Sequence, residues 1–138
     1  MSFEADSIFT DGPSFPCPCC GYLVFSLPPG YHGVCPICHW EDDLSQLRFP
    51  LMPGSTNHVS LQAAQKNFAD FGAGELRHMD KVREPDEVDR QDKNWRPLDE
   101  NTDNIEQPGS GIDYANSYPV DSTVLYYWRE TYWRRIVS

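Results

Sequence analysis

The sequence predicts a small α+β fold with short antiparallel strands near the N-terminus, two short helices after them, then a long acidic loop and an aromatic C-terminal element. Three observations lead to this prediction. Two Cys-x-x-Cys pairs flank a segment rich in β-forming residues, a capped amphipathic segment follows, and Pro- and Gly-rich stretches break up the rest. A chain of 138 residues is enough for one domain, which we expect to span residues 1–138.

Two cysteine knuckles define the first element, with the sequence C-P-C-C at residues 17–20 and C-P-I-C at residues 35–38. Two thiols at this spacing reach one metal ion from a single turn, and two such turns supply four soft ligands. We therefore predict a zinc ribbon over residues 14–45, in which a structural zinc ion is bound by Cys17, Cys20, Cys35 and Cys38. Four thiolates close the coordination shell and leave no position for a substrate.

A secreted module with two disulfides is the alternative for these cysteines. Five is an odd number of cysteines, and Met1–Asp6 lacks the basic and apolar regions of a secretory signal. No apolar run is long enough to cross a bilayer, so we expect a cytoplasmic protein with reduced thiols. Cys19 is expected to be a small buried side chain, with a redox-sensing or reserve-ligand role as the alternative. His39 is expected next to the metal site or at the surface.

The segment between the knuckles predicts the strands of the ribbon. Residues 22–27 are rich in β-forming side chains, and the Pro-Pro-Gly sequence at residues 28–30 ends this strand. Residues 31–34 can return as a second strand, while residues 1–16 form an irregular lead-in.

A helical segment is predicted over residues 56–83. Its first helix begins after the N-cap Ser60 and ends near Phe71, where Gly72 suits the C-terminal turn. A second short helix follows Gly74. The apolar side chains expected to be buried are Leu61, Ala64, Phe68 and Phe71 in the first helix and Leu76, Met79 and Val82 in the second.

The remainder of the chain divides into two parts. Residues 84–120 form a long acidic loop, which Trp95, Leu98 and Ile105 are expected to pin to the body. Residues 121–138 form an aromatic C-terminal element that fits either a helix or strands. We favour a helix capped by Asp121, whose buried stripe would be Leu125, Trp128, Tyr132 and Ile136.

The net charge of −10 is concentrated in one part of the chain. Residues 84–123 hold 11 acidic and 3 basic residues. Such a surface repels nucleic acid and attracts a basic protein, although acidity also serves solubility alone. Aromatic and arginine residues cluster near the C-terminus, as at many interfaces. The candidate partner-binding residues are Asp86, Glu87, Asp89, Asp92, Asp99, Glu100, Asp103, Glu106, Trp128 and Trp133.

Nothing in the sequence positively supports catalysis, and we do not expect an enzyme. The chain has no phosphate-binding glycine loop, Gly-x-Ser-x-Gly elbow or His-Glu-x-x-His motif. The consecutive carboxylates Glu41, Asp42 and Asp43 could bind a hard cation or act in catalysis. Consecutive acids on a loop more often form a solvated face, which is the interpretation we favour.

Several motifs together resemble the bacterial cysteine-rich family named for its Cys-Pro-Cys-Cys motif. They lie at residues 17–22, 35–43, 57–68 and 71–72, within a resemblance that covers residues 16–85 and extends more loosely to residues 95–99. The resemblance implies a zinc ribbon followed by helices, with no catalytic residue to carry over. Members of the family look like small standalone bacterial proteins, some of them linked to secreted toxin systems, and that link implies an immunity role.

Three functional hypotheses follow. The favoured one is a protein–protein interaction module, specifically an immunity protein that covers the cleft of a basic, co-encoded toxin such as a nuclease. The second is a zinc-ribbon regulator that binds nucleic acid or the transcription machinery. The third is a metal-dependent enzyme built on Glu41, Asp42 and Asp43. The favoured hypothesis involves neither a membrane nor nucleic acid.

Overall fold

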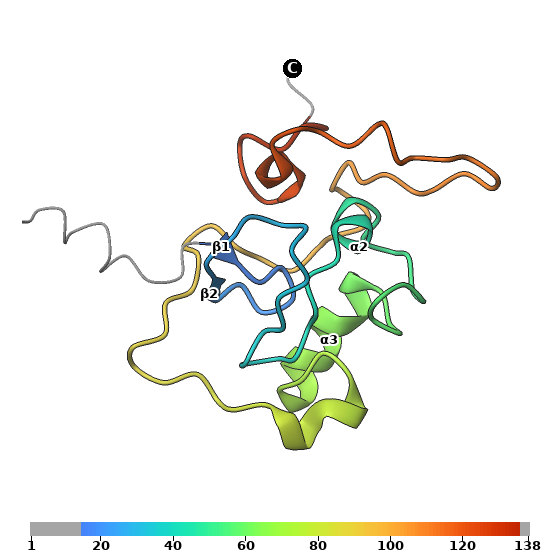
Figure 1. Ribbon diagram of the computed structural model, residues 1–138. Coiled ribbons are helices and arrows are strands. Elements are labelled where there is room, and N and C mark those ends of the chain that lie inside the picture. Colours follow the sequence, from blue (N-terminus) through green and yellow to red (C-terminus); the bar gives the residue numbers. More distant parts are fainter. Residues whose placement is uncertain (1–14, 136–138) are drawn as a thin grey trace, which may run out of the picture.

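The structure, a computed structural model, describes residues 15–135 and has few regular elements (Figure 1). They are strands β1 (Phe15–Pro16) and β2 (Leu23–Phe25), helices α2 (Leu44–Arg48) and α3 (Leu61–Phe71), and 3₁₀ helices η1 (Leu76–Lys81) and η2 (Ser122–Leu125). The protein is thus a small α+β fold. Most of the predicted lead-in, and Ile136 of the predicted C-terminal stripe, lie outside the described residues. No described helix is long and apolar enough to cross a membrane.

The two strands pair antiparallel, but their arrangement differs from the prediction. β2 pairs with β1, which precedes the first knuckle, and Phe15 lies opposite Phe25. The return strand expected after Gly30 is reduced to an isolated bridge between Val34 and Glu41. Gly30 has a φ of 118°, which turns the chain out of an extended path. The hairpin therefore encloses the first knuckle instead of connecting the two.

Helix α3 confirms the first predicted helix at both ends. The Ser60 side chain caps the helix by accepting a hydrogen bond from the Ala63 N–H. Gly72 ends it in the left-handed conformation, with φ of 83°. Leu61 and Ala64 are fully buried, so the beginning of the helix faces the core as expected.

The apolar side chains that follow are buried less than the sequence predicted. Phe68 and Phe71, near the end of α3, are only half-buried. The second helix is the 3₁₀ helix η1, in which Leu76 is 68% and Met79 47% exposed, and Val82 just beyond it is half-buried. The expectation that these last three side chains form a core face is therefore wrong for Leu76 and Met79.

The C-terminal element is not the predicted continuous helix. Asp121 caps the short helix η2 through its carboxylate, as expected, but the helix ends at Leu125. Turns carry the chain on to residue 135. Residues 126–128 are all buried, and three consecutive helical positions cannot share one buried face. Leu125, Trp128 and Tyr132 are nevertheless buried, as the predicted stripe requires.

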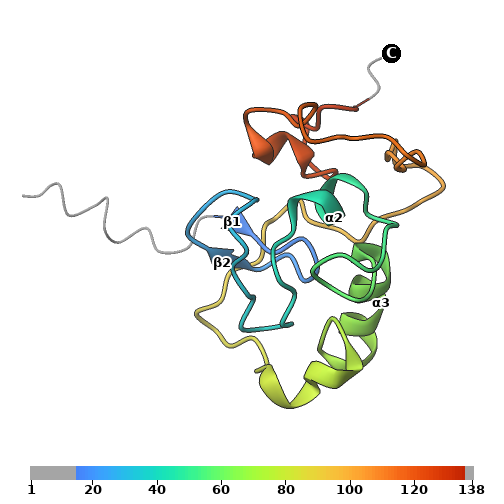
Figure 2. The same ribbon diagram turned by 45° about the vertical axis from the view of Figure 1, so that its right-hand side comes forward.

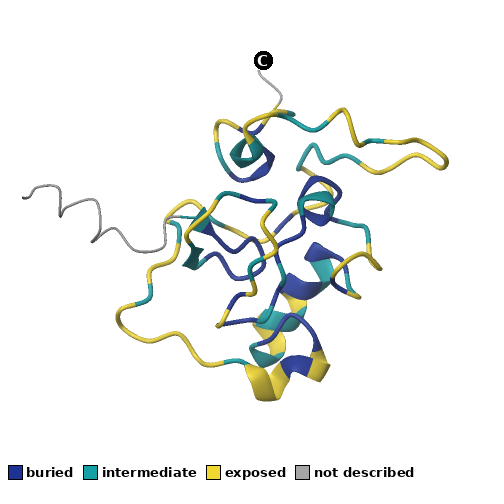
Figure 3. Ribbon diagram, viewed as in Figure 1, coloured by how far each residue is buried: buried dark blue, intermediate teal, exposed yellow. Residues whose placement is uncertain are grey.

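The core surrounds the cysteines and contains side chains from both halves of the chain. Figure 3 shows buried stretches, in dark blue, in the middle of the molecule and in the C-terminal segment. From the C-terminal half it includes Leu98, Leu125, Tyr126, Tyr127, Trp128 and Tyr132. The predicted pins of residues 84–120, which we call the acidic segment, pack as expected, because Leu98 is buried and Trp95 and Ile105 pack against the core. In both ribbon views the C-terminal segment lies beside α2, at the opposite end of the molecule from η1 (Figures 1 and 2).

Candidate metal centre

Four of the five cysteine sulfurs converge on one point. The Sγ atoms of the four cysteines lie within 4.8 Å of one another, and all four side chains are fully buried. Cys17 Sγ lies 3.6 Å from Cys38 Sγ, and Cys20 Sγ lies 3.7 Å from Cys35 Sγ. All five cysteines of the chain are free thiols. The cluster brings together the four predicted ligands and could hold a metal ion.

The two knuckles have the same local structure. The Gly21 N–H donates to the Cys17 carbonyl at 2.7 Å, and the His39 N–H donates to the Cys35 carbonyl at 2.8 Å. Both donors have a left-handed φ, 82° at Gly21 and 68° at His39. His39 therefore occupies the position that glycine fills in the first knuckle, where a side chain costs about 1–2 kcal/mol. His39 lies next to the cluster because its backbone closes the turn of the second knuckle, and not because of its imidazole.

Gly21 also lets Trp95 pack directly on the first knuckle. A Cβ atom at Gly21 would lie 2.5 Å from Cδ2 of Trp95. The indole N–H of Trp95 donates to the Pro18 carbonyl at 2.9 Å, which fixes the ring over the knuckle. The acidic segment is thus anchored at residue 95 to the turn that carries two of the four sulfurs.

Four buried thiols cannot all ionise without a compensating cation. Burial raises the pKa values of Cys17 and Cys38. Hydrogen bonds from Cys17, and then from Cys20 and Cys38, lower the pKa of Cys35 instead. The protein alone thus disfavours the charged form of Cys17 and Cys38 and favours that of Cys35. A divalent cation would favour the ionised form of all four thiols, because its positive charge offsets the cost of burying the thiolates.

Comparison with protein families agrees with this geometry. The family model described as cysteine-rich CPCC matches residues 15–89, more than half of the chain. The chain belongs to the cysteine-rich CPCC family. A search of curated proteins finds no match. We call residues 15–89 the CPCC region and residues 90–135 the C-terminal half.

Within the CPCC region, Cys19 lies beside the cluster without being one of its four members. It is fully buried, and burial raises its pKa, so the thiol is poorly nucleophilic. The expectation of a small buried side chain is confirmed. The sequence analysis missed His78 of η1, which is 7% exposed and stacks on His39 with 3.9 Å between ring centroids. Burial lowers the pKa of His78, which favours the neutral ring in this stack.

The consecutive carboxylates after the second CPCC knuckle do not form the predicted solvated face. Asp42 is 6% exposed, and its Oδ2 accepts the backbone N–H groups of residues 30–32 at 2.7–3.1 Å. Asp43 is 5% exposed and caps α2, a helix that the sequence analysis did not predict. Burial alone would raise the pKa of Asp43, but hydrogen bonds from Ser45, Ser55 and Thr56 lower it. These two carboxylates hold loops in place.

Several predicted partner-binding carboxylates have intramolecular partners instead. Asp86 lies 3.9 Å from Arg83, and Glu100 accepts a hydrogen bond from Gln62 at 2.7 Å. Four others form ion pairs, namely Asp89 with Arg83 at 2.7 Å, Asp92 with Arg129 at 3.0 Å, Asp103 with Arg96 at 2.6 Å and Glu106 with Arg48 at 3.0 Å. These four are therefore poor candidates for partner contacts.

The two tryptophans proposed as contacts differ in exposure. Trp128 is 7% exposed, and its indole N–H donates to Asp92 at 3.1 Å, so this side chain belongs to the core. Trp133 is 39% exposed, with its ring facing Arg48. Only Trp133 can contact a partner without rearrangement of the fold.

Five aspartates between residues 86 and 121 also accept hydrogen bonds from backbone N–H groups close to them in the sequence. In five Asx turns, an aspartate Oδ1 accepts the N–H two residues later at 2.9–3.0 Å. The aspartates are Asp86, Asp92, Asp99, Asp113 and Asp121. Each turn satisfies a backbone donor that a helix or strand would otherwise satisfy. Many of the carboxylates from which we predicted a binding loop thus hold the local backbone in its turns.

The sequence analysis also missed Arg48, at the end of α2. Its side chain is 4% exposed, and its guanidinium donates to both Glu106 oxygens at 3.0 and 3.1 Å and to Ser117 at 2.9 Å. The guanidinium carbon lies 4.6–5.1 Å from four aromatic ring centroids, those of Phe49, Tyr114, Tyr118 and Trp133. This buried cation joins the CPCC region to the C-terminal half. No sequence pattern distinguishes it from the other arginines.

Proposed function

We propose that the four-cysteine cluster of the CPCC region binds a structural zinc ion. Four sulfurs about 2.3 Å from a tetrahedral zinc lie about 3.8 Å apart. The sulfur pairs at 3.6 and 3.7 Å support this geometry, and thiolates favour zinc over magnesium or calcium. Four ligands and full burial leave no open coordination position. The ion would therefore stabilise the fold and take no part in a reaction.

We further propose that the protein is an interaction module that binds a basic protein, and specifically an immunity protein that neutralises a co-encoded toxin such as a nuclease. The observation that carries this proposal is the distribution of charge. The net charge is −10. Six exposed carboxylates between residues 84 and 121 have no ion pair with another described residue, namely Glu84, Glu87, Asp99, Glu100, Asp113 and Asp121.

Unpaired carboxylates would act in two ways on a basic toxin. At a distance, they speed association by attracting the opposite charge. In the complex, they face the Lys and Arg side chains of the cleft, and the body of the protein blocks access to it. Of the carboxylates that the sequence nominated, Glu87, Asp99 and Glu100 remain the strongest candidates, because they have no arginine partner among residues 15–135.

A charge-reversal experiment with the full-length chain tests this proposal. Glu84, Glu87 and Glu100 are replaced together by lysine, because these glutamates form none of the five Asx turns. We expect the association rate with the toxin encoded beside the gene to fall roughly tenfold or more at low salt. Glu130→Lys is the control, since Glu130 is exposed but lies outside the acidic segment.

Two results would count against the proposal in different ways. Unchanged binding by the triple variant would overturn the electrostatic mechanism while leaving an immunity role intact. Absence of any binding or inhibition by the unaltered chain would overturn the immunity role itself.

A further inference from the structure

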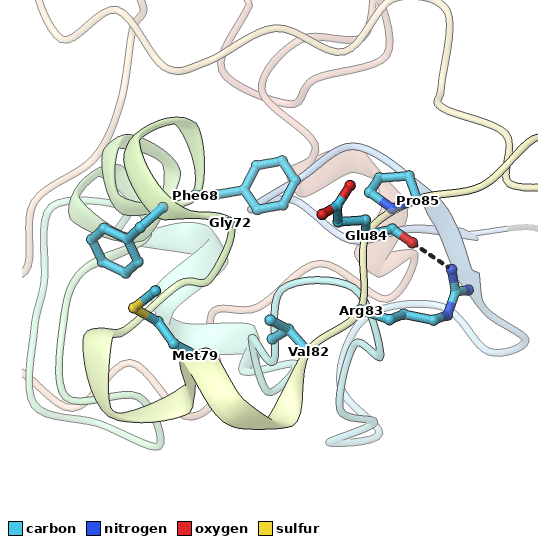
Figure 4. Close-up of a pocket in the computed structure, with 8 residues that line it drawn as sticks. Phe68, Gly72, Met79, Val82, Arg83, Glu84 and Pro85 are labelled. Carbon is cyan, nitrogen blue, oxygen red and sulfur yellow. Dashed lines mark hydrogen bonds between the residues drawn. The ribbon is translucent and has the colours of Figure 1, made fainter.

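A hollow of about 300 Å³ opens between the end of α3 and η1 (Figure 4). Its walls include Phe68 and Phe71 from α3, and Met79 and Val82 from η1 and the residues after it. Figure 4 shows Phe68, Met79 and Val82 facing one common space, with Pro85 at one end. We call this hollow the Phe68–Met79 groove. Its volume lies at the lower end of the range for ligand pockets.

An apolar row on η1 leads into this groove. Residues three apart eclipse each other in a 3₁₀ helix, so Leu76 and Met79 lie in one row, and Val82 follows just beyond the end of η1. Leu76 is 68% and Met79 47% exposed, although the sequence pattern is that of a buried face. Phenylalanine and methionine side chains provide a large and adaptable contact surface. An exposed apolar row beside a hollow of this kind is typical of an interaction site.

Exposed carboxylates lie in the lining of the Phe68–Met79 groove and in the chain next to it. Glu84 lines it, and Asp80 follows Met79 directly; both are exposed. Arg83 is the only cation among the lining residues, and its guanidinium is paired with Asp89 at 2.7 Å. The acidic residues at positions 86 and 87 continue the chain beyond Pro85. Against these carboxylates, η1 carries two exposed cations, Lys81 and Arg77, of which Arg77 is paired with Glu75 at 2.7 Å.

We propose that the Phe68–Met79 groove binds a bulky apolar side chain from a basic partner protein, with Lys or Arg residues on either side of that side chain. The proposal rests on the proposed function and names the surface that would carry it. Transfer of the apolar side chain from water into the groove supplies affinity. The carboxylates beside the groove favour a partner in which Lys or Arg residues flank that side chain. An uncharged partner would gain only the first contribution, and a purely basic one only the second.

Two synthetic peptides test this inference on the full-length chain. One has a single leucine between two runs of lysine, and the other has serine in place of the leucine. We expect the leucine peptide to bind roughly tenfold more tightly and to shift the NMR methyl signals of Met79 and Val82. Met79→Gln should remove most of this preference. Val88→Gln is the matched control, because Val88 is 77% exposed within the same acidic stretch but does not line the groove.

The outcomes separate the groove from the wider proposal. Equal binding of both peptides, shifts confined to acidic residues, or an unaffected Met79→Gln variant would each overturn the groove while leaving electrostatic binding intact. Failure of the leucine peptide to bind would also overturn the groove, and the toxin experiment above would then decide the proposed function by itself. Folding of both variants is checked by their amide spectra, since Met79 is half exposed.

Discussion

The CPCC region and the C-terminal half acquire their structure by different means. The CPCC region contains both strands, both α-helices and η1, arranged around four buried sulfurs. The C-terminal half has η2 as its one helix and no strand between residues 90 and 135. There, aspartate side chains accept backbone N–H groups, and arginines pair with Asp92, Asp103 and Glu106.

The difference shows that a chain can follow a defined path with little regular secondary structure, provided that its backbone donors find other acceptors. It also shows where such a segment is vulnerable. A helix shares its hydrogen bonds over many residues, whereas each Asx turn depends on one side chain. A few side chains join the two regions, among them Gln65, which bonds to Pro18, Tyr127 and Leu98.

Removal of the proposed zinc ion should have the largest effect, and it should fall first on the CPCC region. Chelation, or Cys35→Ser, is expected to remove about 10 kcal/mol of folding free energy, which exceeds the stability of many small domains. Circular dichroism and elemental analysis measure the loss of structure and of bound zinc. Cys19→Ser is the control and should retain one zinc ion per chain. Equal zinc loss in both variants would contradict the assignment of the four ligands.

Replacement of Arg48 should have the second-largest effect, because Arg48 joins the CPCC region to the C-terminal half. Arg48→Met leaves the half-buried Glu106 carboxylate unpaired and empties the space between four aromatic rings. We expect a loss of about 3–5 kcal/mol in the free energy of unfolding, measured with urea. Arg83→Met provides the comparison, because its ion pair with Asp89 is exposed and should matter far less. Similar losses in the two variants would remove Arg48 as the link between the regions.

Gly21→Ala tests the contact between the first knuckle and Trp95. The new Cβ would overlap the indole ring and would also occupy a left-handed φ, so we expect a loss of about 2–4 kcal/mol. Gly54→Ala isolates the cost of the backbone, because Gly54 has φ of 77° but a Cβ atom added there would meet no other atom within 4 Å. Equal effects of the two substitutions would show that the Trp95 contact contributes nothing.

Acid should weaken the C-terminal half through Asp92, with the smallest of these effects. Burial alone would raise the pKa of Asp92, but hydrogen bonds from the Asn94 N–H, Arg129 and Trp128 lower it. Its ionised form therefore stabilises the fold above the unfolded pKa of about 3.9, and this contribution is lost as the pH falls towards the lower folded value. After solvent screening it amounts to about 1 kcal/mol.

The measurement compares unfolding of the unaltered chain and Asp92→Asn between neutral and acidic pH. Asp92→Asn should be less stable than the unaltered chain at neutral pH, and the difference in their free energies of unfolding should shrink on acidification. Any contribution of a bound metal is the same in both proteins and cancels from this difference. Asparagine can still form the Asx turn, so the change reports the charge. Asp113→Asn, at a turn without an ion pair among the described residues, should show no such convergence.

Local signals in the sequence carried the predictions that the structure confirms. The spacing of the cysteines predicted the cluster, and Ser60 and Gly72 predicted both ends of α3, because these features act within a few residues. The pairing of β2 with β1, the exposure of Met79 and the burial of Asp42 and Asp43 could not be predicted in this way. Each depends on which distant backbone groups or side chains come to lie beside them.

The sequence by itself thus determined the family, the four converging thiols and the main helix of this protein. Tertiary structure decided how its carboxylates are used. Whether a carboxylate caps a helix, pairs with a buried arginine or faces solvent depends on donors brought from elsewhere in the chain, as Asp43, Glu106 and Glu87 illustrate. Net charge is a sum over the whole chain, but the field that a partner meets comes from the carboxylates that the fold leaves unpaired.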